Sequence, residues 1–163
     1  MKLKQTKHLR VVAITPSYRG FGYAVLDGDA LVDWGVKSVS GDKNARCLEE
    51  VEELIAHYLP AVIVLQDHSG GQSRRSDRIR ELSSRIVAVA SSLKLRVAVF
   101  SDQQVKQAYF ADGRGTKHAI AKILAARFPE ELGFRLPPKR RAWMGQDYRM
   151  GIFDAVALAL LIC

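Results

Sequence analysis

Hydrophobic and polar residues along the first forty positions follow a pattern that predicts three short strands. The stretch from Val11 to Leu26 enters a Pro-Ser-Tyr-Arg-Gly turn as one apolar run and leaves it as a second. Asp27-Gly28-Asp29 then leads into a third run, from Ala30 to Ser38. β-Branched and aromatic runs separated by such turn residues are typical of antiparallel strands. The pattern therefore predicts a three-stranded antiparallel meander.

After the meander the apolar period changes and predicts alternating helices and strands. Apolar residues between Cys47 and Leu59 recur at helical spacing, and Pro60 ends that helix. Ala61–Leu65 and Leu95–Phe100 are short apolar runs, and the first is continuous, as in strands buried on both faces. Between them, residues 79–93 place one apolar stripe on a long helix. Its other face is expected to carry five arginines, Arg74, Arg75, Arg78, Arg80 and Arg85.

The remaining chain predicts three more helices. Ser101 and Gln104 have capping-box spacing, which favours a short helix after the last strand. Thr116 is expected to cap a second helix that stops at Pro129, and the last helix is expected over about Asp147 to Leu161. The order of elements predicts an α/β fold, a mixed five-stranded sheet flanked by helices.

One domain accounts for the length of the chain. With 163 residues, 48% of them hydrophobic, the chain fills one core without dividing into two, so we expect a single domain over residues 1–163. No apolar run approaches the length of a membrane span, and no stretch of signal-peptide type follows the charged start. Cys47 and Cys163 form no zinc-binding pattern. We expect a cytoplasmic protein without membrane attachment.

The charge of the chain points to a polyanionic partner. Twenty-five Lys and Arg residues against 17 Asp and Glu residues give a formal net charge of +8. Basic side chains gain affinity for nucleic acid by releasing the counterions condensed on its phosphates. The charge therefore favours a nucleic-acid partner.

Several motifs together resemble one known family. Ile14-Thr15-Pro16-Ser17 ends the first strand, Val105-Lys106-Gln107 follows the fifth, and Gly113-Arg114-Gly115-Thr116-Lys117 comes soon after. The last helix reads Asp154-Ala155-Val156-Ala157-Leu158-Ala159. In this order they resemble the RuvC-like Holliday junction resolvases of the ribonuclease H-like superfamily, from about Val11 to Cys163. The resemblance implies a ribonuclease H-like fold.

The resemblance also implies a metal centre, whose ligands are largely replaced in this chain. RuvC-like nucleases hold two Mg²⁺ or Mn²⁺ ions about 4 Å apart with carboxylates. Their ligand positions fall on Thr15, Gln66, Gly151 and Asp154, and only Asp154 keeps an acid. It is therefore the candidate metal ligand.

Two further carboxylates, Asp67 and Asp147, are candidate substitutes at the catalytic site. Adjacent residues of a strand point to opposite faces, so Asp67 joins Gln66 only if the strand has ended or bulged. On a helix, Asp147 and Asp154 share a face but are separated by a rise of about 10 Å. One ion does not bridge that gap.

Basic residues at several element ends are candidates for nucleic-acid binding. We expect them to surround one cleft, with Trp143 and Tyr148 adding base stacking. The candidates are Arg19, Arg74, Arg75, Lys106, Arg114, Lys117, Lys139, Arg140, Arg141 and Trp143.

Three functions stay open at this point. The first is a RuvC-like protein that binds branched or structured DNA and has lost or reduced its nuclease activity. The second is an active, metal-dependent endonuclease that cuts four-way junctions as a homodimer, as the resemblance implies. The third is an assembly protein that uses the apolar stripe of the long helix. Dependence on Mg²⁺ or Mn²⁺ distinguishes the first from the second.

Overall fold

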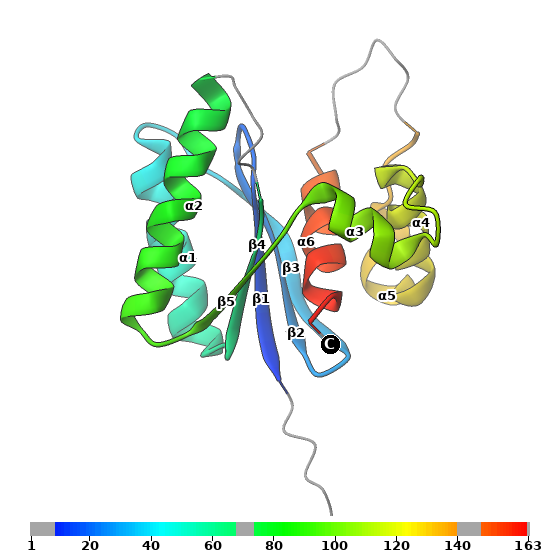
Figure 1. Ribbon diagram of the computed structural model, residues 1–163, viewed down its shortest axis with the longest axis horizontal. Helices are drawn as coiled ribbons and strands as arrows, with labels where there is room; N and C mark the ends of the chain where they lie inside the picture. The colour runs from blue at the N-terminus through cyan, green and yellow to red at the C-terminus, as the bar shows by residue number, and fades with distance from the viewer. Residues whose placement is uncertain (1–8, 68–73, 140–147, 163) are drawn as a thin grey trace, which may run out of the picture.

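A mixed five-stranded sheet forms the centre of the molecule (Figure 1). The computed structural model describes residues 9–67, 74–139 and 148–162, without the side chains of 74–76. The strand order is β3-β2-β1-β4-β5. Strands β1, β2 and β3 form the predicted antiparallel meander, and β1, β4 and β5 pair in parallel. The strands are β1 (Arg10–Pro16), β2 (Gly20–Asp27), β3 (Ala30–Ser38), β4 (Val62–Gln66) and β5 (Arg96–Phe100).

Helices cover both faces of this sheet. In Figure 1, α1 and α2 lie against one face, while α6 lies against the other with α3, α4 and α5 on its outer side. None of the helices in the described ranges is long and apolar enough to cross a membrane. The bounds are α1 (Lys43–Tyr58), α2 (Arg74–Ser92), α3 (Asp102–Tyr109), α4 (Lys117–Arg127), α5 (Pro129–Leu132), the 3₁₀ helix η1 (Gly133–Arg135) and α6 (Met150–Leu160).

The alternation of side chains along β1 divides the core into two parts. Val11 and Ala13 pack in the cluster under α6, whereas Val12 and Ile14 pack in the cluster under α1 and α2. Residues 155–159 of α6 are all buried, because this helix is apolar around nearly its whole circumference. Helix α6 is therefore a fixed central element.

The last helix begins later than the sequence predicts. It starts at Met150, and the preceding residues form a turn in which the Gly151 N–H donates to the Tyr148 carbonyl at 3.2 Å. No side chain caps this end, since Arg149 stands at the cap position. The sequence thus gives no cap signal for the true start. Asp147 lies outside the described residues.

Arg78 also differs from the prediction, because it does not project from the outer face of α2. Its guanidinium donates to Asn44 Oδ1 at 3.1 Å and to the Ser17 carbonyl at 2.9 Å. Arg78 directly precedes the buried Ile79, so it lies at the edge of the apolar stripe and reaches α1 and the β1–β2 turn. It ties three elements together.

Candidate functional site

The predicted ligand positions meet where the carboxyl ends of β1 and β4 approach the start of α6. Thr15 lies near the end of β1, Gln66 ends β4, and Asp154 lies in the second turn of α6. Parallel pairing of β1 with β4 brings the carboxyl ends of these strands to one edge of the sheet. The structure therefore gathers the positions that the resemblance assigned to metal ligands.

Thr15 and Gly151 contact each other directly at this edge. The Thr15 side chain is buried, with 4% of the residue exposed. Its hydroxyl lies 3.0 Å from the Gly151 carbonyl oxygen and 3.3 Å from the Gly22 carbonyl oxygen, positioned to donate to either. The hydroxyl is thus committed to backbone acceptors.

Gly22 allows the backbones of β2 and α6 to approach each other at the same place. A Cβ on Gly22 would lie 2.3 Å from the Gly151 carbonyl oxygen, which is far inside van der Waals contact. Only a residue without a side chain fits there. We call Thr15, Gly22 and Gly151 the seam, because they join α6 to the sheet by direct contact.

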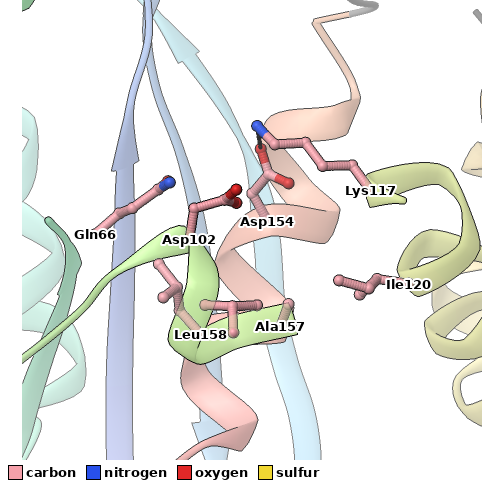
Figure 2. A pocket seen from close by; sticks show the side chains of 8 residues that line it. Gln66, Asp102, Lys117, Ile120, Asp154, Ala157 and Leu158 are labelled. Carbon is pink, nitrogen blue, oxygen red and sulfur yellow. Dashed lines mark ion pairs between the residues drawn. The ribbon is translucent and has the colours of Figure 1, made fainter. Parts of the chain in front are cut away.

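Asp154 lies one helical turn beyond the seam and forms an ion pair. Its Oδ2 is 3.6 Å from the Lys117 Nζ, and its side chain is 21% exposed (Figure 2). Lys117 begins α4, where the Thr116 hydroxyl caps the helix by accepting from the Ala119 N–H at 3.0 Å. The capped start of α4 therefore places a cation beside Asp154, the one acid among the four predicted ligand positions.

A second carboxylate, Asp102, faces the same small cavity. It begins α3 after β5, and its Oδ2 is 3.2 Å from the Lys106 Nζ one turn later. The cavity holds about 20 Å³, room for about one water molecule. We call it the charged cavity; Figure 2 shows its polar side chains gathered near the start of α6. It is lined by Gln66, Asp102, Val105, Lys117, Ile120, Asp154, Ala157 and Leu158.

Sequence reasoning did not identify Asp102, although a signal was present. The Ser101–Gln104 capping box, confirmed in the structure, puts Asp102 in the first turn of α3. Because β5 pairs in parallel with β4, that turn starts at the same sheet edge as Gln66. The capping box and the strand order together predict that Asp102 lies at this edge of the sheet.

Asp67 lies elsewhere, as the strand period predicts. It lines a separate cavity of about 380 Å³ between the sheet and α2, with Arg80 and Val99 among the other lining residues. Its N–H donates to the Phe100 carbonyl at 2.8 Å, which continues the pairing of β4 with β5. Strand β4 ends at Gln66, but the Asp67 N–H keeps the pairing with β5, and Asp67 does not line the charged cavity.

The described residues do not fit a two-metal centre. They contain no group of three or more His, Cys, Asp or Glu side chains placed to hold a metal ion. The Thr15 hydroxyl points at backbone carbonyls, and a lysine ammonium accompanies Asp154. Mg²⁺ and Mn²⁺ require several hard, anionic oxygen ligands.

Burial raises the pKa of one tyrosine behind the charged cavity. The Tyr109 hydroxyl donates to the Ala157 carbonyl at 3.0 Å and joins the end of α3 to α6. Loss of solvent around this phenol raises its pKa to about 12. The phenol therefore stays neutral and keeps the α3 wall of the cavity in place at ordinary pH.

Five of the predicted nucleic-acid-binding residues have described side chains. Lys106 and Lys117 take part in the ion pairs of the charged cavity, and Arg19 lies in the β1–β2 turn, 5.3 Å from the centre of the Tyr148 ring. Arg114 and Lys139 are exposed. Arg140, Arg141 and Trp143 lie outside the described residues, and Arg74 and Arg75 are placed only as the start of α2.

The strand order and the flanking helices define a ribonuclease H-like fold of the RuvC type. No family model matches the sequence, and no curated protein matches it. The likeness is to solved structures at low sequence identity, and it shows the fold.

Three solved structures illustrate this likeness. Thermus thermophilus RuvC has a TM-score of 0.69 at 18% identity, covering 93% of this chain and 92% of that chain. T. thermophilus RuvC in complex with Holliday junction substrate has a TM-score of 0.71 at 20% identity, covering 94% and 92%. The yeast mitochondrial Holliday junction resolvase Ydc2 has a TM-score of 0.66 at 14% identity, covering 93% and 76%.

Proposed function

We propose that this chain is a RuvC-like nucleic-acid-binding protein that recognises branched or structured DNA and has lost or reduced the nuclease activity of its fold. The fold supports the binding part of the proposal, since a neighbour of the same fold was solved in complex with a Holliday junction. The net charge of +8 supports it as well.

One observation carries the loss of nuclease activity: the seam stands where the metal ligands of the fold would converge. A two-metal mechanism needs a cluster of carboxylates to hold the ions that activate water. Here the Thr15 hydroxyl faces the Gly151 carbonyl, and the backbones of Gly22 and Gly151 are in contact. Lys117 supplies a positive charge to Asp154, which further disfavours a divalent cation.

The basic residues near this edge support binding without metal. Arg19 comes from the β1–β2 turn, Lys106 from α3, and Arg114 and Lys117 from the segment that opens α4. Lysine and arginine side chains bind phosphates without any divalent ion. Binding by this group should therefore survive a chelator and weaken steeply as salt rises.

The first test mixes the purified protein with a labelled four-way DNA junction and with a matched linear duplex. Each mixture is prepared with Mg²⁺, with Mn²⁺ and with EDTA, and is run on native and denaturing gels. The expected result is a shifted junction without nicks in all three conditions. Absent or salt-independent binding would contradict the proposed function.

Charge-neutralising variants test where the DNA lies. Lys106→Gln and Arg114→Gln should each weaken junction binding severalfold and lower the slope of log K against log salt by about 1. Lys94→Gln is the matched control, because Lys94 is exposed at the turn before β5, at the opposite end of that strand. An equal loss in all three variants would indicate a diffuse electrostatic effect instead of this surface.

A specific observation favours one alternative, an active metal-dependent junction endonuclease. Asp102 and Asp154 both line the charged cavity and come from different elements, as metal-binding carboxylates do. Under this alternative the protein acts as a homodimer and uses Mg²⁺ or Mn²⁺. Metal-dependent symmetric nicks, abolished by both Asp154→Asn and Asp102→Asn, would establish it and overturn the proposal above.

A further inference from the structure

Two tyrosines beside the seam expose most of their surface to solvent. Within the described ranges, three Tyr or Phe side chains are more than half exposed: Tyr18 at 60%, Tyr148 at 55% and Phe134 at 72%. Tyr18 follows Thr15 by three residues, and Tyr148 precedes Gly151 by three. Large exposed aromatic side chains at a functional edge are typical of interaction surfaces.

Each of these tyrosines has a cation over its ring. The Arg19 guanidinium carbon lies 5.3 Å from the centre of the Tyr148 ring, and the Lys43 Nζ lies 4.0 Å from the centre of the Tyr18 ring. Such contacts restrict the orientation of the ring and add positive charge beside it. A ring held in this way loses little side-chain entropy when a ligand stacks on it.

The turn that carries Tyr18 and Arg19 is held from several sides. The Ser17 N–H donates to the Gly20 carbonyl at 2.9 Å, and Arg78 from α2 donates to the Ser17 carbonyl at 2.9 Å. Lys43 from α1 donates to the Tyr18 carbonyl at 2.9 Å. The turn is therefore fixed before any ligand arrives.

The two tyrosines belong to the same end of the molecule as the seam. Figure 1 shows the β1–β2 turn and the start of α6 at one end of the sheet, and the Arg19–Tyr148 contact joins them. Phosphate-binding charge and flat aromatic surface together are what a splayed nucleotide requires. A fully paired duplex offers no free base face to such a surface, whereas the branch point of a junction does.

We propose that Tyr18, Arg19, Lys43 and Tyr148 form a stacking platform for a base whose face is exposed at the branch point, with the two cations on the adjoining phosphates. The platform rests on the proposed function, because it takes its ligand from bound branched DNA. The platform adds to the proposed function the chemical feature of the DNA that the protein recognises, which is an exposed base face.

Photo-crosslinking tests the contact directly. A set of four-way junctions carries 5-iodouracil at each branch-point position in turn, and the irradiated complex is digested and analysed by mass spectrometry. We expect cross-links on Tyr18 or Tyr148. Phe134 is the matched control, because it is more exposed and also has an arginine, Arg135, at 5.3 Å from its ring centre.

Affinity measurements with variants give the second readout. Tyr18→Ala and Tyr148→Ala should each weaken junction binding by about 5- to 100-fold, whereas Tyr148→Phe and Phe134→Ala should leave it within about twofold. An abasic nucleotide at the cross-linked position should remove most of the difference between wild type and Tyr148→Ala. All of these side chains are exposed, so folding is not at risk.

The outcomes separate the platform from the proposed function. Tight junction binding by both alanine variants, with no cross-link on either tyrosine, would overturn the platform and leave the binding function standing. A wild-type protein that does not bind the junction would overturn both.

Discussion

The seam and the charged cavity lie one helical turn apart on α6, and they are built in opposite ways. The seam is closely packed: the buried Thr15 hydroxyl lies against backbone carbonyls, and the backbones of buried Gly22 and half-buried Gly151 touch. The charged cavity consists of longer, partly exposed side chains in two ion pairs, Lys106 with Asp102 and Lys117 with Asp154. The geometry of the seam is fixed by steric contact, whereas the charged cavity is held by electrostatic interactions between side chains that can move.

This difference shows what holds α6 against the sheet at this edge. A metal centre needs uncompensated negative charge, but the seam is neutral and the two carboxylates of the cavity are each matched by a lysine. At the seam, α6 is therefore held against the sheet by direct packing. Substitutions in the seam should mainly change stability, and substitutions in the cavity should mainly change binding.

The largest expected effect comes from Gly22→Ala. The new Cβ would collide with the Gly151 backbone, at 2.3 Å from its carbonyl oxygen, and α6 would have to move. We expect a loss of at least about 3 kcal/mol in the free energy of unfolding, measured by urea denaturation. Gly133→Ala is the control, because nothing lies within 4 Å of a Cβ there. Equal stability of the two variants would mean that the seam is not tightly closed.

The next largest effect on stability is expected from Thr15→Asp. This variant distinguishes a closed, neutral seam from a site that can still hold a metal ion. The introduced carboxylate would be buried against the carbonyl oxygens of Gly22 and Gly151, at a cost of about 2 to 3 kcal/mol at pH 7. Burial raises the pKa of such an acid above its unfolded value, so the penalty should be smaller at pH 4 than at pH 8. Thr15→Ser keeps the hydroxyl and should stay near wild type.

Addition of Mg²⁺ decides how Thr15→Asp is interpreted. The Tm of this variant should be the same in about 10 mM Mg²⁺ as in EDTA, because the seam has no room for a hydrated ion. A clear rise in Tm with Mg²⁺ would show that this edge accepts a metal ion and that the seam is not closed to ions.

Much of the fold follows from the sequence because its signals are local. The antiparallel meander, the buried β4 run and the Ser101–Gln104 capping box are each set by residues close in the chain, and all are confirmed. The exclusion of Asp67 from the cavity likewise follows from the two-residue period of a strand. Periodicity is sufficient for such features.

Other features depend on contacts between distant residues, which periodicity does not reveal. The start of α6 lacks a cap residue, so its late beginning shows only in the packing of Gly151 on Gly22. The sequence predicts Arg78 on the face of α2 opposite the apolar stripe, yet its partners Asn44 and Ser17 come from other elements. The pairing of Lys117 with Asp154 spans 37 positions of the chain and depends on where α4 lies beside α6.

Tyr109→Phe should show a smaller effect, which appears in the pH dependence of stability. The pKa of Tyr109 is raised to about 12 in the folded protein from its ordinary value near 10, because burial disfavours the phenolate. The native state then holds its proton more tightly than the unfolded state, so stability falls as pH rises from about 10 to about 12.

In Tyr109→Phe this contribution is lost together with the hydrogen bond to Ala157, at a cost of about 1 kcal/mol at pH 8. The fall above pH 10 should be shallower than in wild type, as followed by circular dichroism in urea. Tyr148→Phe is the control, because Tyr148 is exposed. An unchanged slope in Tyr109→Phe would place the titration on other tyrosines, such as Tyr58, whose pKa is also raised to about 12.

The smallest effect on stability is expected at the ion pair, with Lys117→Gln. The Lys117 side chain is 40% exposed, so the loss of stability should be well under about 1 kcal/mol, close to that of Lys122→Gln on the exposed side of the same helix.

The two variants should differ in metal affinity if the Lys117 ammonium is what excludes a metal ion from Asp154. Removing the ammonium leaves Asp154 and Asp102 at the cavity, and two carboxylates bind Mn²⁺ only weakly. We therefore expect slight, millimolar-scale Mn²⁺ binding in Lys117→Gln by electron paramagnetic resonance and none in Lys122→Gln. Tight Mn²⁺ binding with junction cleavage in Lys117→Gln would show that the charged cavity, and not the seam, determines whether this fold has metal-dependent nuclease activity.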